Sequence, residues 1–184
     1  MKPVVSLNNK KFNKVMIDTS SLMQQSSFVT LMKETIIPEL SNSGMKLTVP
    51  QAVLRELRKF VQENSPRALT AQKALEGINA LSKVGYVAFE GNPNLEERPD
   101  SYMMREVVRA KMEQEKVLVI SQDYQLALDL MSLNQIRSTI TPACNVKRIN
   151  ANGELENFNL AIAPKTEQKQ YSNIQNVLKR FGIQ

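Results

Sequence analysis

The stretch VMIDTS, residues 15–20, places an aspartate directly after a run of apolar residues. A second stretch, VLVISQD at residues 117–123, has the same form and ends in Asp123. Short apolar runs of this kind are typical of buried strands in parallel sheets, whose ligands bind beyond the carboxyl ends of the strands. We therefore expect Asp18 and Asp123 to face one crevice, and we predict a divalent-metal site there.

The residue types that the sequence lacks limit the catalytic mechanisms that it can use. The chain has no histidine and a single cysteine, Cys144. This excludes a Ser-His-Asp triad, a Cys-His pair and imidazole acid–base chemistry on RNA. It also excludes the usual catalytic zinc ligands and an internal disulfide. Carboxylates that hold Mg²⁺ or Mn²⁺ are left as the expected catalytic groups, and a reducing, cytoplasmic location is expected.

Size and charge indicate the class of partner. With 184 residues, 42% of them hydrophobic and 23% charged, the chain is expected to fold as one domain with a proper core. No run approaches the roughly 18 apolar residues of a membrane span, and we predict neither a secretory signal nor a membrane partner. The net charge of +6 and the pI near 9.5 favour an anionic partner, although simple solubility would explain the same charge.

Apolar runs alternate with amphipathic segments along the chain. This alternation predicts a parallel sheet covered by helices on both faces, an α/β fold of three layers. One helix is expected from Ser20 to Ile37, and residues 1–13 are expected to form a loose arm. The expected strands cover residues 14–17, 47–49, 86–89, 117–120 and 139–141.

The last forty residues differ from this pattern. Residues 146–150 and 155–160 flank an Asn-Gly pair, which predicts a β-hairpin. A final amphipathic helix is expected around residues 174–181. We therefore divide the chain into a core, residues 14–142, and a C-terminal extension, residues 143–184, packed on the same domain.

Two further acids are expected at the same edge of the sheet. Asp100 stands at a predicted helix start after the loop that leaves the third strand, and Glu56 lies beside the apolar face of the helix after the second strand. Acids that converge in this way repel one another unless a cation is present. Taken singly, each aspartate also suits a helix N-cap, and Glu56 also suits a solvated helix position. The hydroxyls of Ser20 and Ser121 are candidates to orient a carboxylate or a water molecule.

The segments IDTSSL (17–22), LTVPQAVLREL (47–57) and VISQDYQLA (119–127) together resemble the PIN domain family. The resemblance spans roughly residues 14–142 and implies a compact α/β/α sandwich. Active members of that family are metal-dependent nucleases, mostly single-strand endoribonucleases.

The resemblance also implies roles for individual residues. It makes Asp18, Asp100 and Asp123 the metal ligands, with Glu56 completing the site or positioning water. Glu96 and Glu97 compete with Asp100 for the third acidic position. The loop at residues 91–99 is longer than compact family members lead us to expect, and the chain beyond Cys144 has no counterpart.

Single-stranded RNA would require a basic track and surfaces for stacking. Tyr102 and Tyr124 stand near the acids and could stack on bases, although core packing is an alternative for them. The candidate RNA-binding residues, each of which could also be a solvated helix residue, are Arg55, Arg58, Lys59, Arg98, Arg105 and Arg109.

The sequence thus predicts a Mg²⁺- or Mn²⁺-dependent endoribonuclease that hydrolyses single-stranded RNA. A catalytically inactive PIN-like module that binds RNA or protein, and a structure-specific DNA nuclease, are the alternatives. A phosphoryl-accepting domain is disfavoured, because Ser20 stands where a phosphatase of the haloacid dehalogenase type has its second Asp. A receiver domain is disfavoured because Ile17, and no acid, precedes Asp18. The extension could bind a protein partner or a second copy, and roles in a toxin pair, ribosomal-RNA processing or RNA turnover all stay open.

Overall fold

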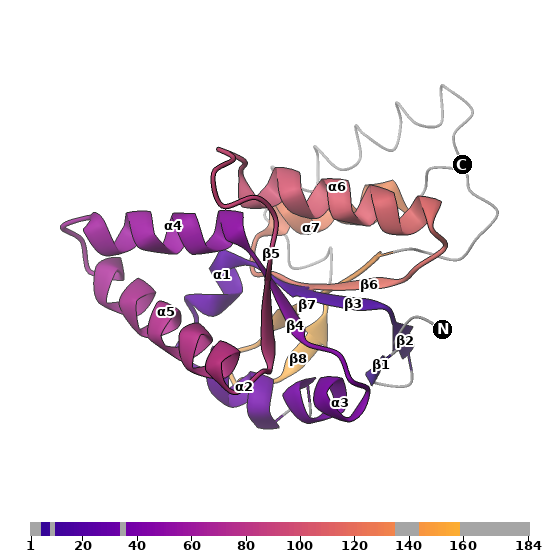
Figure 1. Cartoon of the computed structure of the whole chain (residues 1–184), viewed down its shortest axis with the longest axis horizontal. Coiled ribbons are helices and arrows are strands. Elements are labelled where there is room, and N and C mark those ends of the chain that lie inside the picture. The colour runs from indigo at the N-terminus through magenta and orange to yellow at the C-terminus, as the bar shows by residue number, and fades with distance from the viewer. Residues whose placement is uncertain (1–4, 8–9, 34–35, 135–143, 159–184) are drawn as a thin grey trace.

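The computed structural model describes residues 5–7, 10–33, 36–134 and 144–158, which include a six-stranded sheet in the order β5-β4-β3-β6-β7-β8 (Figure 1). The first five strands in this order are parallel to their neighbours, and β8 runs antiparallel to β7. The strands are β3 (Lys14–Ile17), β4 (Leu47–Pro50), β5 (Val87–Glu90), β6 (Val117–Ile120), β7 (Cys144–Ile149) and β8 (Leu155–Asn157).

Helices cover both faces of this sheet, with α6 and α7 on one side and α2 and α3 on the other (Figure 1). Every residue of β4 and β6 is buried, as a sheet covered on two faces requires. The predicted α/β/α sandwich is therefore confirmed. The helices are α1 (Thr19–Leu22), α2 (Ser27–Lys33), α3 (Ile36–Asn42), α4 (Gln51–Gln62), α5 (Arg67–Lys83), α6 (Pro99–Met112) and α7 (Tyr124–Leu133).

The N-terminal part differs from expectation in two places. The arm contains an antiparallel pair, β1 (Val5–Leu7) and β2 (Lys10–Phe12). Its last residue, Phe12, is buried in the core, which accounts for its ordered position. The single helix expected up to Ile37 is divided into α1, α2 and α3. The hydroxyl of Ser27 donates 3.3 Å to the carbonyl of Leu22, so a side chain binds a carbonyl where α1 ends.

The predicted C-terminal hairpin is present as β7 and β8, with Gly153 at φ +78° in the turn. Strand β7 also pairs with β6, so the hairpin is continuous with the main sheet. Thr30 on α2 donates 2.6 Å to the carbonyl of Gly153 and holds the turn against the helix layer. The strand expected at 139–141 and the helix expected around 174–181 lie outside the described residues. The division at residue 142 stays a prediction.

Helix α6 rests on the sheet through a buried charged group. Lys14, at the start of β3, donates hydrogen bonds to Glu90 of β5 at 2.6 Å and to Glu106 of α6 at 2.7 Å. Arg109, on the same helix, donates 2.6 Å to Glu106. Burial raises the pKa of Glu106, but the bond and charge of Lys14, together with Arg109, outweigh burial and lower it overall. This group fixes the helix that carries Asp100.

Among the described residues, no helix combines the length and the apolar run that crossing a bilayer requires.

Candidate active site

The carboxyl ends of β3 and β6 bring two distant segments together. These strands are parallel neighbours with Ile17 opposite Ile120, and the amide of Asp18 donates 2.9 Å to the Ile120 carbonyl. The residues that follow, Asp18 and Ser121, therefore start their loops side by side. This is the crevice position that open α/β sheets use for ligands.

The carboxylate of Asp18 is 4% exposed and accepts three hydrogen bonds. Its Oδ1 accepts from the Thr19 amide at 2.7 Å, and its Oδ2 accepts from the hydroxyls of Ser20 at 2.6 Å and Ser121 at 3.0 Å. Burial raises the pKa of Asp18, the three bonds oppose that rise, and the charge of Asp100 adds to it. The result is a desolvated carboxylate with a raised pKa, which a cation would stabilise in its charged form.

The hydroxyls of both serines also accept hydrogen bonds from backbone amides of the β6–α7 connection. The Ser20 hydroxyl accepts from the amide of Gln122 at 2.9 Å, and the Ser121 hydroxyl accepts from the amide of Asp123 at 3.0 Å. Each hydroxyl therefore donates to Asp18 and accepts from the backbone of the β6–α7 connection. Ser20 and Ser121 fix the orientation of the Asp18 carboxylate and the start of α7 at the same time.

Asp123 and Asp100 begin two neighbouring helices. Asp123 is the N-cap of α7, and its Oδ1 accepts from the Leu126 amide at 3.0 Å, so the capping interpretation of this residue also holds. Asp100 does not cap α6. Arg98 occupies the N-cap and Pro99 opens the helix, because proline suits a first position where no amide partner is needed.

The pKa of Asp100 is changed by the charges of several neighbouring acids. Asp100 is exposed, but partial desolvation of its carboxyl raises its pKa, and the charge of Asp123 raises it further. Arg98 lowers it, and the charges of Glu56 and Asp129 raise it again. Glu56 is half-buried on α4, on the far side of the cavity described below. The acids expected from four separate segments therefore act on one another electrostatically.

Asp129 belongs to the same group of acids, although the sequence patterns did not single it out. Burial raises its pKa, a 2.9 Å bond from Gln125 lowers it, and the charge of Asp123 raises it. One signal was available: Asp129 is the only charged residue in the otherwise neutral helix α7. The chain contains four aspartates, Asp18, Asp100, Asp123 and Asp129, and the structure places all four at this edge.

The donor set matches the chemistry of a hard cation, since carboxylate and hydroxyl oxygens are the ligands that Mg²⁺ and Mn²⁺ prefer. The spacing is wider than a coordination sphere: no three Asp, Glu or Cys side chains in the described part of the chain stand close enough to share an ion. Asp100 and Asp123 are both exposed, whereas Asp18 is buried and held. Closure around a cation would require the two exposed carboxylates to turn toward Asp18.

The basic candidates fall into two groups. Arg58, Lys59 and Arg98 are exposed; Lys59 shares a cavity wall with Glu56, and the charge of Arg98 acts on Asp100. The other three are engaged within the protein. Arg55 donates to three carbonyls of the β5–α6 loop, Arg105 pairs with Glu97, and Arg109 pairs with Glu106.

The two tyrosines considered for stacking both contact other side chains, with Tyr102 buried and Tyr124 half-buried. Tyr102 is 3% exposed and lies under the guanidinium of Arg105, 5.0 Å from the ring centre. Tyr124 packs edge-on against Phe158 at 5.1 Å and accepts a bond from Arg148 at 2.5 Å. Core packing is therefore the observed role of Tyr102.

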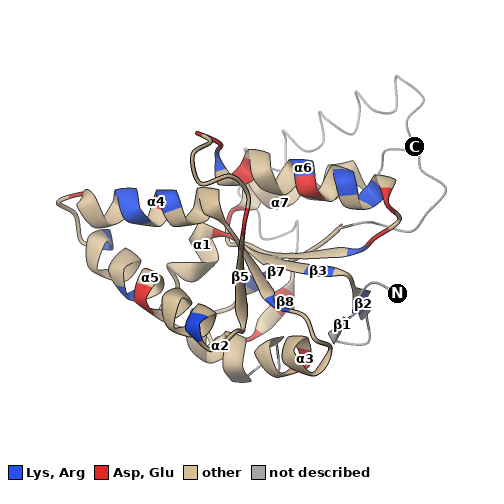
Figure 2. Cartoon of the chain, in the orientation of Figure 1, with Lys and Arg blue, Asp and Glu red and all other residues tan. Residues whose placement is uncertain are grey.

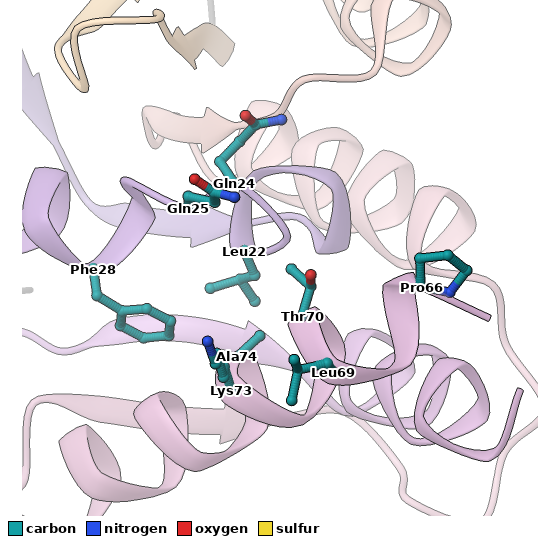
Figure 3. A pocket seen from close by; sticks show the side chains of 9 residues that line it. All are labelled: Leu22, Gln24, Gln25, Phe28, Pro66, Leu69, Thr70, Lys73 and Ala74. Carbon is teal, nitrogen blue, oxygen red and sulfur yellow. The ribbon is translucent and has the colours of Figure 1, made fainter. Parts of the chain in front are cut away.

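Two cavities differ in their relation to the acids: one has an acid in its wall, and the other has none. One, of about 440 Å³, lies between α4 and the β5–α6 loop and has Glu56 in its wall. Another, of about 480 Å³, lies between α5 and the segment around α1 and α2 (Figure 3). Its lining contains Phe28, Leu69 and Lys73 but no Asp or Glu, so it offers none of the predicted acid chemistry.

The sheet of mostly parallel strands, covered by helices on both faces, is a PIN-like fold, as comparison with solved structures shows. Among solved structures, the protein is similar to the PIN domain endonuclease Utp24, with a TM-score of 0.51 and 15% sequence identity over 79% of this chain and 92% of that chain. No family model and no curated protein sequence matches the chain. At this identity the likeness establishes the fold and leaves the chemistry to the residues.

Proposed function

We propose that this protein is a divalent-metal-dependent endoribonuclease that cleaves single-stranded RNA. The observation that carries the proposal is the gathering of all four aspartates of the chain, with Glu56, at the carboxyl edge of the sheet, where the charges of neighbouring acids add to the raised pKa values of Asp18, Asp100 and Asp129. Carboxylates held near one another at an electrostatic cost are typical of functional sites. The similarity to a protein described as a PIN domain endonuclease supports the same class.

Under this proposal Asp18, Asp100 and Asp123 hold Mg²⁺ or Mn²⁺, and Glu56 completes the site or orients water. A bound cation would supply a water molecule of lowered pKa and positive charge for the leaving oxygen. Ser20 and Ser121 keep the Oδ2 of Asp18 in a fixed direction. The burial of Asp18 excludes bulk water from one side of the site and strengthens its attraction for a cation.

The substrate assignment depends on charge and exposure. Basic side chains are distributed along α4 and α6, as Figure 2 shows. Arg58 and Lys59 are exposed one turn or less from Glu56, and Arg98 directly precedes the first turn of α6. Phosphate contacts of this kind give affinity without base specificity, so we expect little dependence on sequence. A protein partner or a second copy that binds the extension, residues 143–184, and a cytoplasmic location stay part of the proposal.

The test is a cleavage assay with end-labelled single-stranded RNA, duplex RNA and single-stranded DNA, each with Mn²⁺, Mg²⁺ or EDTA. We expect the single-stranded RNA to be cut with either metal and to stay intact with EDTA. Asp18→Asn and Asp123→Asn should each abolish cutting while the circular dichroism spectrum stays that of the parent. Glu76→Gln, at an exposed acid on α5, is the matched control and should cut like the parent.

Two other outcomes would overturn the proposal. Cutting of DNA alone would favour a DNA nuclease. The second outcome is an inactive module that binds no metal. The amide of Thr19 donates to Asp18 and the amide of Leu126 donates to Asp123, and these bonds would hold both acids in place without a metal. Calorimetry that detects no heat with Mn²⁺, together with RNA binding in EDTA, would establish an inactive binding module.

A further inference from the structure

The side chain of Arg55 is bound to a loop that lies 37 to 42 positions further along the chain. Its Nη1 donates 3.2 Å to the carbonyls of Asn92 and Pro93, and its Nη2 donates 2.9 Å to the carbonyl of Glu97. A planar guanidinium presents several donors in fixed directions, whereas a lysine ammonium is a compact charge on a flexible stem. Three carbonyls around one guanidinium therefore specify arginine at this position.

The same loop is held at both ends. At its start, Gly91 has φ +98°, and a Cβ added there would lie 3.0 Å from the ring of Tyr102. Near its end, the carboxylate of Glu97 pairs with Arg105, whose guanidinium covers the same ring. The loop thus connects β5 to α6 along a fixed path, and Arg55 is its contact with α4.

This path separates two of the acids. Glu56 follows Arg55 on α4, and Asp100 stands in the first turn of α6, directly after the loop. The cavity of about 440 Å³ has Glu56 and Lys59 on its α4 wall, and its opposite wall contains Glu96 and Arg98 of the loop and Pro99, the residue before Asp100. Arg55 is the residue that bonds one wall to the other.

We propose that Arg55 is a positioning residue that sets the separation of Glu56 and Asp100 by holding the β5–α6 loop. This inference rests on the proposed nuclease function for its kinetic consequence, but the loop contact itself does not. It gives Arg55 a role different from the phosphate contact that its position in the sequence suggested. The two roles make opposite predictions for RNA binding and turnover.

The variant is Arg55→Lys, which keeps the charge and removes the fork of donors. We expect kcat to fall by about 10- to 100-fold, the usual effect of losing a residue that orients the groups at a metal site. The Kd for RNA in EDTA, and the slope of log Kd against log salt, should match those of the parent. The amides of residues 91–98 should exchange with deuterium faster than in the parent. Arg67→Lys, at an arginine that contacts Glu63 and Phe60, is the control and should change none of these values.

A phosphate contact would give the reverse result. In Arg55→Ala, which removes the charge together with the donors, KM and the Kd for RNA would then rise with kcat preserved, and the salt slope would decrease by about one. That result would overturn the inference. Unchanged deuterium exchange in residues 91–98 would overturn it as well, whatever the kinetics.

Two more measurements separate this inference from the proposed function. If the parent protein cuts no RNA, the nuclease proposal fails, and the exchange comparison alone decides the role of Arg55. If Arg55→Lys does not fold, Arg55→Ala is measured with and without added free guanidinium. Recovery of slow exchange in residues 91–98 on adding guanidinium supports the inference, and its failure overturns it.

Discussion

The hydroxyl of Ser121 donates a 3.0 Å hydrogen bond to the Oδ2 of Asp18, across 103 positions of sequence. Ser121 is 1% exposed and Asp18 is 4% exposed, so neither group has bulk water as a substitute partner. The same hydroxyl accepts the amide of Asp123 at 3.0 Å. One buried serine thus connects the first acid of the site to the fourth.

Ser121→Ala should weaken the site more than the fold. The Oδ2 of Asp18 and the amide of Asp123 both lose a partner, which should lower the free energy of unfolding by about 1–3 kcal/mol. Cleavage should fall by about 10- to 100-fold, because the Asp18 carboxylate loses one of its two orienting hydroxyls. Urea unfolding and initial cleavage rates measure the two effects. Ser43→Ala, which removes a hydroxyl bonded to a helix carbonyl, should leave the cleavage rate unchanged.

Asp18→Asn should stabilise the fold at neutral pH while it removes activity. Burial raises the pKa of Asp18 above its ordinary 3.8, so the folded state resists ionisation of this group. Asp18 contributes most to the free energy of unfolding below pH 3.8. This contribution is lost as the pH rises through the raised pKa of the folded state.

Because asparagine does not ionise, the variant does not lose this free energy as the pH rises. The variant should therefore exceed the parent by roughly 0.5–2 kcal/mol at pH 7, the size typical of single stabilising substitutions. The difference should vanish as the pH approaches 3.8. Thermal melts of both proteins across this range measure it, and a variant less stable than the parent at pH 7 would contradict the electrostatic account.

Lys14→Met should destabilise the attachment of α6. The substitution leaves Glu106, 9% exposed in its side chain, with Arg109 as its remaining cation, and the loss of one partner of a buried pair costs up to about 3–5 kcal/mol. Because the pKa of Glu106 is lowered in the fold, its contribution is present above 4.5 and is lost as the pH falls through the lowered value. The gap in denaturation midpoint between parent and variant should therefore narrow in acid. Lys46→Met, at an exposed lysine before β4, should shift stability by less than about 0.5 kcal/mol.

Gly91→Ala should cost more than Gly44→Ala, although both glycines have positive φ. Gly44, at φ +69°, has open space where a Cβ would lie, so alanine there meets only the backbone penalty of about 1–2 kcal/mol. At Gly91 the added carbon would also meet the buried ring of Tyr102 at 3.0 Å. We expect a loss of about 2–4 kcal/mol there, measured by urea unfolding. Equal losses at the two positions would show that Tyr102 moves aside freely.

The positions of the buried strands along the chain and the carboxyl-edge crevice were predictable because both depend on local patterns. Apolar runs mark the buried strands, and the aspartates that follow Ile17 and Gln122 mark where two of them end. Parallel pairing then brings these ends together without any knowledge of side-chain contacts. The hairpin was predictable for the same reason, since Asn-Gly is a local signal.

The parts that sequence reasoning missed depend on long-range contacts. Nothing near Arg55 indicates that three carbonyls of a later loop will surround its guanidinium. The place of Asp129 beside the other acids depends on how α7 packs against α6. Asp100 was expected to cap α6 because aspartate favours that position, but the Pro99 ring starts the helix one residue earlier.

In the hairpin of β7 and β8, the short strand β8 covers the outer edge of β7. β8 occupies the hydrogen-bonding groups of β7 along Lys147–Ile149, and the ion pair of Arg148 with Glu156 and the bond from Thr30 to Gly153 keep it there. An uncovered border of a parallel sheet is a template on which a second molecule can add its own strand. A chain shortened to remove β8 should therefore form strand-paired aggregates at concentrations where the intact hairpin keeps molecules apart.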